Sequence, residues 1–173
     1  MVQLRKQETQ LILRIIERLG EGDDALAIRR SIAPDVLRRL GADHFASFVW
    51  SPVTGKYEDC AFLNMDPANL ARYNAYYQFH DPITTLLQRC RRAVLVSEVM
   101  LQADLERTEF WNDFLMRDGL HHGINFHAFD GDRHVGDLRV WRSRRQPLFG
   151  RHERELLEIL KLNHPGFTGD SII

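Results

Sequence analysis

The chain has 173 residues, 44% of them hydrophobic, with 23 basic and 24 acidic side chains. This is enough for one domain with a buried core, and a formal net charge of −1 gives no electrostatic reason to expect direct binding of nucleic acid or an anionic membrane. Its two cysteines lack metal-ligand spacing, and no apolar run reaches the ~20 residues of a membrane-spanning helix. We expect a cytoplasmic protein with a single domain over residues 1–162 and a flexible tail at 163–173.

Two helices are predicted at the start of the chain. Apolar residues between Leu4 and Leu19 recur at helical spacing, and Gly20 follows the last of them. A second helix is predicted across residues 24–40, ending at Gly41, and Pro34 is expected to break or kink it.

Two strands joined as a hairpin are predicted next. Residues 44–50 are rich in aromatic and β-branched side chains, and residues 51–63 begin with turn-forming serine, proline and glycine. Asp66 and Pro67 then start a helix, because proline is tolerated at a first-turn position.

The stretch of residues 71–82, ARYNAYYQFHDP, concentrates aromatic rings beside an acid. Tyr73 and Tyr77 are four residues apart and share one helical face, and the helix is expected to stop before Pro82. Such rings can line a ligand pocket in which Asp81 accepts a hydrogen bond from the ligand. Alternatively, the tyrosines fill the core and Asp81 caps the following helix. The sequence leaves both interpretations open.

The middle of the chain predicts further short elements. A basic cluster is expected to be the solvated end of a helix, and residues 93–100 to form a short buried strand or an extended run that leads to a Ser97 cap. Residues 109–120 predict a helix that presents Phe110 and Phe114 on one face and stops at Gly119. The basic cluster consists of Arg89, Arg91 and Arg92.

A second hairpin is predicted from residues 122–129 and 134–141, because an Asp-Gly turn joins two alternating segments. We expect the N-terminal helix and a C-terminal helix at 151–162 to cover its apolar face, whereas its polar face is either exposed or the floor of a pocket. The apolar face comprises Ile124, Phe126, Ala128, Leu138 and Val140, and the polar face comprises Gly123, Asn125, His127, Asp137, Arg139 and Trp141.

This order of elements predicts an α+β fold, in which a PAS/GAF-like antiparallel sheet is sandwiched between helices. The helical insertion between the two hairpins would close over one face of the sheet.

Several landmarks, in order, resemble the N-terminal effector-binding domain of LuxR-type transcriptional regulators, including the autoinducer-binding and GAF-like branches. They are the aromatic helix before Asp81-Pro82, the E-F-W and R-D-G-L segments at 109–120, the hairpin, and P-L-F-G-R-H-E-R-E-L-L at 147–157. The likeness covers residues 40 to 160. It implies a small-molecule effector, a homodimer, and DNA contact only through a helix-turn-helix that is absent from this sequence.

The resemblance also implies roles for individual residues. It places Tyr73 or Tyr77 and Asp81 as polar pocket residues. It also implies that Asn125 and Arg139 face the ligand, and the alternation of the strands independently puts these two residues on the polar face. Leu70 and Val96 stand where lactone receptors usually carry tryptophan, so we expect a more polar or anionic ligand, with Arg139 and His127 nearby. The implied ligand-binding residues are Tyr73, Tyr77, Asp81, Phe110, Leu120, Asn125 and Arg139.

Catalysis is not expected, and neither is a cofactor or a metal. His121 and His127 would lie roughly 20 Å apart along a strand, too far for one metal ion. A hydrolase that used Asp81 with His80 would also need a nucleophile, and the sequence offers no candidate. It also has no nucleophile elbow, phosphate-binding loop or dinucleotide-binding motif. Two functions remain: a small-molecule-sensing regulatory domain, or an interaction and dimerisation module that binds no ligand.

Overall fold

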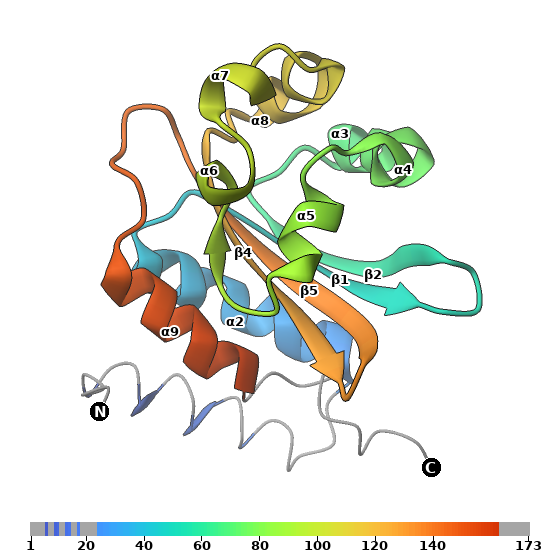
Figure 1. The fold of residues 1–173 in the computed structure, drawn as a ribbon. Helices are drawn as coiled ribbons and strands as arrows, with labels where there is room; N and C mark the ends of the chain where they lie inside the picture. Colours follow the sequence, from blue (N-terminus) through green and yellow to red (C-terminus); the bar gives the residue numbers. More distant parts are fainter. Residues whose placement is uncertain (1–5, 7–8, 11–12, 15–16, 18–23, 163–173) are drawn as a thin grey trace.

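The computed structural model describes residues 24–162, together with residues 6, 9, 10, 13, 14 and 17 (Figure 1). Most of the predicted first helix, and all of the predicted tail at 163–173, lie outside the described residues.

The centre of the fold is a five-stranded antiparallel sheet with strand order β2-β1-β5-β4-β3. Both predicted hairpins form, and pairing of β1 with β5 joins them into one sheet. Asn125 on β4 lies opposite Arg139 on β5 and also pairs with Val94 on β3. The strands are β1 (His44–Ser51), β2 (Lys56–Leu63), β3 (Val94–Leu95), β4 (His122–Asp130) and β5 (Arg133–Arg142).

Two helices, α2 (Ala25–Leu40) and α9 (Arg151–Leu162), cover the apolar face of the sheet (Figure 1). Every residue predicted for that face is buried in one hydrophobic core with the apolar side chains of α2 and α9. The prediction that the C-terminal helix covers this face is therefore confirmed. Within the described residues, the second helix that covers it is α2.

Of the two predicted effects of Pro34, a break or a kink, the break does not occur. Asp24 caps α2 by accepting hydrogen bonds from two backbone N–H groups, and the helix continues past Pro34 to Leu40. Proline inside a helix costs about 3 kcal/mol or more. Burial of Ile32, Val36 and Leu37 around it offsets this cost, since each contributes roughly 1.5–3 kcal/mol. The helix ends at Gly41, as predicted, in the left-handed conformation with φ 54°.

Short helical segments cover the opposite face of the sheet and form the predicted insertion (Figure 1). Two of them, η1 and η2, are π-helical turns within longer helices. The segments are α3 (Pro67–Arg72), η1 (Tyr73–Tyr77), α4 (Gln78–His80), α5 (Thr84–Arg89), α6 (Val96–Val99), α7 (Gln102–Leu105), η2 (Trp111–Leu115) and α8 (Met116–Asp118). None of the helices in the described part of the chain has the length and apolarity needed to cross a lipid bilayer.

The start of α6 differs from the prediction. Ser97 lies inside the helix, and the helix begins after Leu95. The Glu98 carboxylate accepts a hydrogen bond from the Leu95 backbone N–H at 2.7 Å. At the start of this helix, the Glu98 carboxylate therefore takes the role that was predicted for the Ser97 hydroxyl.

The two helical arms over this face pack their aromatic rings against each other and against the sheet. We call α3, η1 and α4 the tyrosine arm, and η2 with α8 the phenylalanine arm. Tyr73 and Tyr77 of the first arm lie 5.3 and 5.7 Å from the ring of Phe114 in the second. These contacts form a second buried core, separated by the sheet from the core under α2 and α9.

Candidate ligand-binding site

A small cavity lies between the sheet and the two helical arms. The volume that the centre of a water molecule can reach inside it is about 20 Å³. This is enough for one or two buried waters. Any larger ligand therefore requires the lining side chains to move. The lining residues are Ala46, Phe48, Met65, Leu70, Tyr73, Asp81, Ile83, Thr84, Phe110, Phe114, Leu115, Leu120, Asn125, Arg139 and Trp141.

Arg139 forms the charged part of the cavity floor. Its Nε and Nη2 donate to the same carboxylate oxygen of Asp137 at 2.9 and 2.6 Å, and its Nη1 donates to the Tyr73 hydroxyl at 2.5 Å. Burial opposes the charge on Arg139, but the facing Asp137 outweighs it, so the pKa of Arg139 is raised above its usual value. The guanidinium is thus charged and already engaged.

Three aromatic rings surround the same guanidinium. The Arg139 Cζ lies 4.8 Å from the ring centroid of Phe48, 5.0 Å from that of Tyr57 and 4.9 Å from that of Tyr73. Such cation–π contacts favour the charged form when water is excluded. Asp137 offsets the charge of Arg139, and three of the five N–H groups of this guanidinium are engaged among the described residues. The more polar or anionic ligand expected from the sequence stays a prediction.

Asp81 takes part in both alternatives that the sequence left open. Its Oδ1 accepts from the backbone N–H groups of Ile83 at 2.7 Å and Thr84 at 3.0 Å, which holds the turn before α5. Its Oδ2 accepts from the Thr84 hydroxyl and, at 3.4 Å, from the Tyr73 hydroxyl. The same side chain lines the cavity. Asp81 thus holds the turn that precedes α5, whose N-cap is Ile83, while the same residue lines the pocket.

Asn125 presents an unused acceptor. Its side chain is 1% exposed, and its Oδ1 has no hydrogen-bond partner among the described residues. A buried acceptor without a donor costs roughly 1–3 kcal/mol. A ligand or water that donates to this oxygen would remove that cost.

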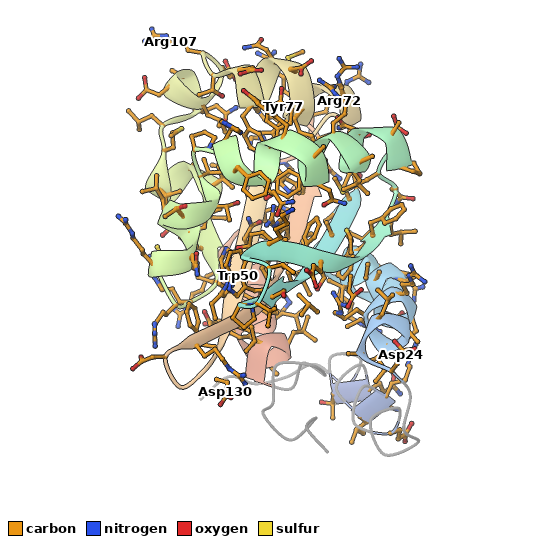
Figure 2. The ribbon with its side chains drawn as sticks, turned by 90° about the vertical axis from the view of Figure 1, so that its right-hand side faces the viewer. Asp24, Trp50, Arg72, Tyr77, Arg107 and Asp130 are labelled. Carbon is orange, nitrogen blue, oxygen red and sulfur yellow. The ribbon has the colours of Figure 1, made fainter. Side chains whose placement is uncertain are left out.

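Tyr77 differs from the other predicted site residues, because it does not line the cavity. Its hydroxyl donates to the Asp113 carboxylate on the phenylalanine arm, where Arg72 also forms an ion pair. Asp113 also accepts a hydrogen bond from Arg117 Nη2 at 2.9 Å. The hydrogen bond from Tyr77, followed by that from Arg117, lowers the pKa of Asp113 to about 2. Figure 2 shows Arg72 and Tyr77 on the helical layer, above Trp50 and the strands. Tyr77 therefore ties the two arms together.

The other six predicted residues are gathered around the cavity: Tyr73, Asp81, Phe110, Leu120, Asn125 and Arg139. Sequence reasoning did not assign the other nine of the fifteen lining residues to the site, among them Phe48 and Thr84. The alternation of β1 is a signal that places Phe48 on the same face as Ala46. Leu70, noted as a departure from the lactone receptors, lines the cavity, whereas Val96 is buried away from it.

A histidine pair lies on the same face of the hairpin, outside the cavity. His127 Nδ1 and His134 Nε2 are 3.1 Å apart, and the second nitrogen of each ring has no partner in the part of the chain that the structure describes. Burial, ahead of nearby charges, lowers the pKa of His127 to about 3. Among the described residues, no group of three or more potential metal ligands occurs.

The fold resembles those of several solved structures. CepR2 of Burkholderia cenocepacia, an N-acylhomoserine lactone-dependent LuxR-family transcription factor, superposes with a TM-score of 0.68 at 20% identity, over 92% of this chain and 93% of that one. SdiA in complex with octanoyl-rac-glycerol gives 0.61 at 20% identity, over 93% and 66% of the two chains. A GAF domain of a Coxiella burnetii phosphotransferase gives 0.66 at 12% identity, over 90% and 89%.

The chain has the fold of these ligand-binding and GAF domains. The resemblance to LuxR-type effector-binding domains that the sequence predicts is thereby confirmed at the level of the fold. No protein-family model and no curated sequence matches the chain. In this LuxR/GAF-like fold, the cavity lies between the sheet and the helical insertion.

Proposed function

We propose that this chain is the small-molecule-sensing domain of a LuxR-type transcriptional regulator, and that the effector binds in the cavity between the sheet and the helical arms. One observation carries the proposal: Asn125 lines that cavity, and its buried Oδ1 has no hydrogen-bond partner among the described residues. Native proteins leave few buried polar atoms unsatisfied, so this position calls for a hydrogen-bond donor from outside the chain.

The available atoms define the chemistry of the effector. Asn125 Oδ1 is an acceptor without a donor among the described residues. Asp81 Oδ2 is a second acceptor that the Tyr73 and Thr84 hydroxyls already contact. Three of the five N–H groups of Arg139 are engaged. The rest of the lining is mostly aromatic and aliphatic. A matching effector carries one or two N–H or O–H donors on an apolar body. N-acylhomoserine lactones and octanoyl-rac-glycerol, named with two structural neighbours, both have this composition.

Binding of such a molecule is coupled to movement of the arms, because the cavity is nearly filled. The arms contact each other through the Tyr77–Asp113 hydrogen bond, the Arg72–Asp113 ion pair and the tilted rings of Tyr77 and Phe114. An effector that separates the rings changes the position of the arms, and its preference for the open arrangement determines the shift.

The test is thermal and urea unfolding of the chain with octanoyl-rac-glycerol and, separately, octanoyl-homoserine lactone. A ligand at 100 times its dissociation constant stabilises the fold by about 2.7 kcal/mol. We expect this stabilisation in the native chain and its loss in Asn125→Ala.

A matched control is Asn69→Ala, because Asn69 is also 1% exposed but does not line the cavity. This variant should be less stable without ligand, since Asn69 Nδ2 donates to the Phe114 carbonyl oxygen, and should keep the ligand-induced stabilisation. An equal ligand effect in Asn125→Ala and the native chain would contradict the proposal.

The closed state of the cavity favours a second candidate, a homodimerising interaction module whose pocket is filled by its own side chains. In this case both acyl compounds leave the stability unchanged, and Asn125→Leu stabilises the fold by removing the unpaired oxygen. Sedimentation at several concentrations measures whether the chain forms a dimer.

A further inference from the structure

A second hollow, larger than the cavity, opens on the surface beside the phenylalanine arm. Its volume is about 500 Å³, within the range of roughly 300–1,000 Å³ typical of small-molecule sites. The arm forms one wall, and residues 143–145, which follow β5, form the other. We call this hollow the arginine groove.

Two arginines give the groove its charge. Arg144 and Arg145 are exposed, and neither has an ion pair or hydrogen bond with a described residue. Their neighbour Arg142 is different, because it is buried and paired with Glu153. Among the described residues, Glu106 is the only acid in the groove lining, and its carboxylate accepts a hydrogen bond from Gln102 at 3.0 Å. The groove therefore has an excess of positive charge.

Trp111, which is 7% exposed, and Met116 supply apolar surface to the opposite wall. The ring of Trp111 lies edge-on to His121 with centroids 5.3 Å apart, and the side chain of Met116 is 56% exposed beside it. Burial, then His122, lowers the pKa of His121. An aromatic or thioether surface of this kind packs well against a planar ring.

Leu120 separates the arginine groove from the cavity. It lines both spaces and is only 1% exposed. A molecule in the groove therefore contacts the outer side of the cavity wall. The groove is nevertheless a distinct place, because its charge and polar atoms are not those of the cavity.

We propose that the arginine groove binds an organic carboxylate with a planar apolar group. The carboxylate accepts hydrogen bonds from Arg144 and Arg145, and the ring packs on Trp111 and Met116. Guanidinium groups match the two oxygens of a carboxylate, and charged hydrogen bonds of this kind are among the strongest in proteins. This site is independent of the effector proposed for the cavity.

The probe is 1-naphthoate, compared with its neutral analogue 1-naphthamide in calorimetric titrations of the full chain. We expect naphthoate to bind at millimolar or lower concentration and the amide to bind at least about tenfold more weakly. In Arg144→Gln/Arg145→Gln, naphthoate should fall to the affinity of the amide. The control Arg133→Gln/Arg151→Gln removes two exposed arginines that lie outside the groove and should retain native affinity.

Three outcomes would overturn the proposal: no naphthoate binding at millimolar concentration, equal binding of acid and amide, or unchanged affinity in the Arg144/Arg145 variant. Asn125→Ala separates the two sites. If it abolishes naphthoate binding while the Arg144/Arg145 variant retains it, the probe occupies the cavity, and the groove proposal fails without harm to the proposed sensor function.

Discussion

The two faces of the β4–β5 hairpin are buried in two different ways. On one face, Phe126 and Leu138 are fully buried against α2 and α9, and the polar neighbours there are paired, since Arg29 of α2 donates to the backbone oxygen of the β1 residue opposite Leu138. On the other, shifted by one residue, Asp137 and His127 are just as fully buried, beneath the short helical arms. Burial therefore does not distinguish core from site. The distinction is whether each buried polar atom has a partner, and the arm-covered face holds both satisfied and unsatisfied groups.

The largest expected effect comes from the ion pair on the arm-covered face. Arg139→Met leaves the Asp137 carboxylate, 0% exposed, without its guanidinium, so we expect a loss of about 3–5 kcal/mol in the free energy of unfolding. Urea denaturation measures it. The double variant Asp137→Leu/Arg139→Met should recover much of the loss, because no unpaired charge remains.

Leu157→Met on α9 is the matching change on the apolar face. It conserves volume and should cost less than about 1.5 kcal/mol. If Arg139→Met costs no more than this, the two faces do not differ as proposed.

A smaller effect follows from His127. Its pKa is lowered from 6.5 to about 3 by burial, so below pH 6.5 the unfolded chain takes up a proton that the folded chain does not. The stability is complete above pH 6.5 and is lost as the pH falls toward 3. We expect about 2 kcal/mol of loss from this group by pH 5.

The measurement is urea denaturation at pH 7 and pH 5, for the native chain and for His127→Asn. The variant should lose about 2 kcal/mol less between the two pH values. Identical losses would mean that His127 titrates normally in the fold.

The smallest effect should be the same on both sides of the sheet. Gly41 ends α2 and Gly119 ends α8, with φ of 54° and 70°. Alanine at Gly119 meets no atom within 4 Å, so only the strain of the left-handed conformation remains, about 1 kcal/mol. Alanine at Gly41 should cost slightly more, because its Cβ lies 3.4 Å from Arg142 Nη2. Thermal unfolding of both variants checks this, and a much larger loss at Gly119 would show that the arm needs its glycine for packing.

Much of the fold follows from local patterns in the sequence. The alternation in β4 and β5 and the glycines after α2 and α8 predicted the hairpin faces and the helix ends, because these depend on neighbouring residues alone. Pro34 shows the limit of such rules, since the local penalty is overcome by burial against a distant sheet. The π-helical turns were not predicted either. Tyr73 and Tyr77 would share a face in an α-helix as well, so their spacing does not report the hydrogen-bond pattern.

The site could be predicted in part. Asn125 and Arg139 followed from strand alternation, and the resemblance to LuxR-type domains suggested Tyr73, Asp81, Phe110 and Leu120. The closure of the cavity could not be inferred, because it depends on how the side chains of seven or more separate segments fit together. The pairing of Arg139 with Asp137 was missed for a different reason: residues two apart on a strand share a face, but only the rotamers decide whether they bond.

The π-helical turns have a consequence for chain length. Such a turn holds one residue more than an α-helical turn, so it behaves as a single-residue insertion into an otherwise regular helix. Related chains one residue shorter at 73–77 or 111–115 would revert to an ordinary turn and keep their flanking residues on the same faces. Sequence alignments of such chains should place single-residue gaps within these two segments. Tyr73 and Phe114 would then align with residues that face the same cavity.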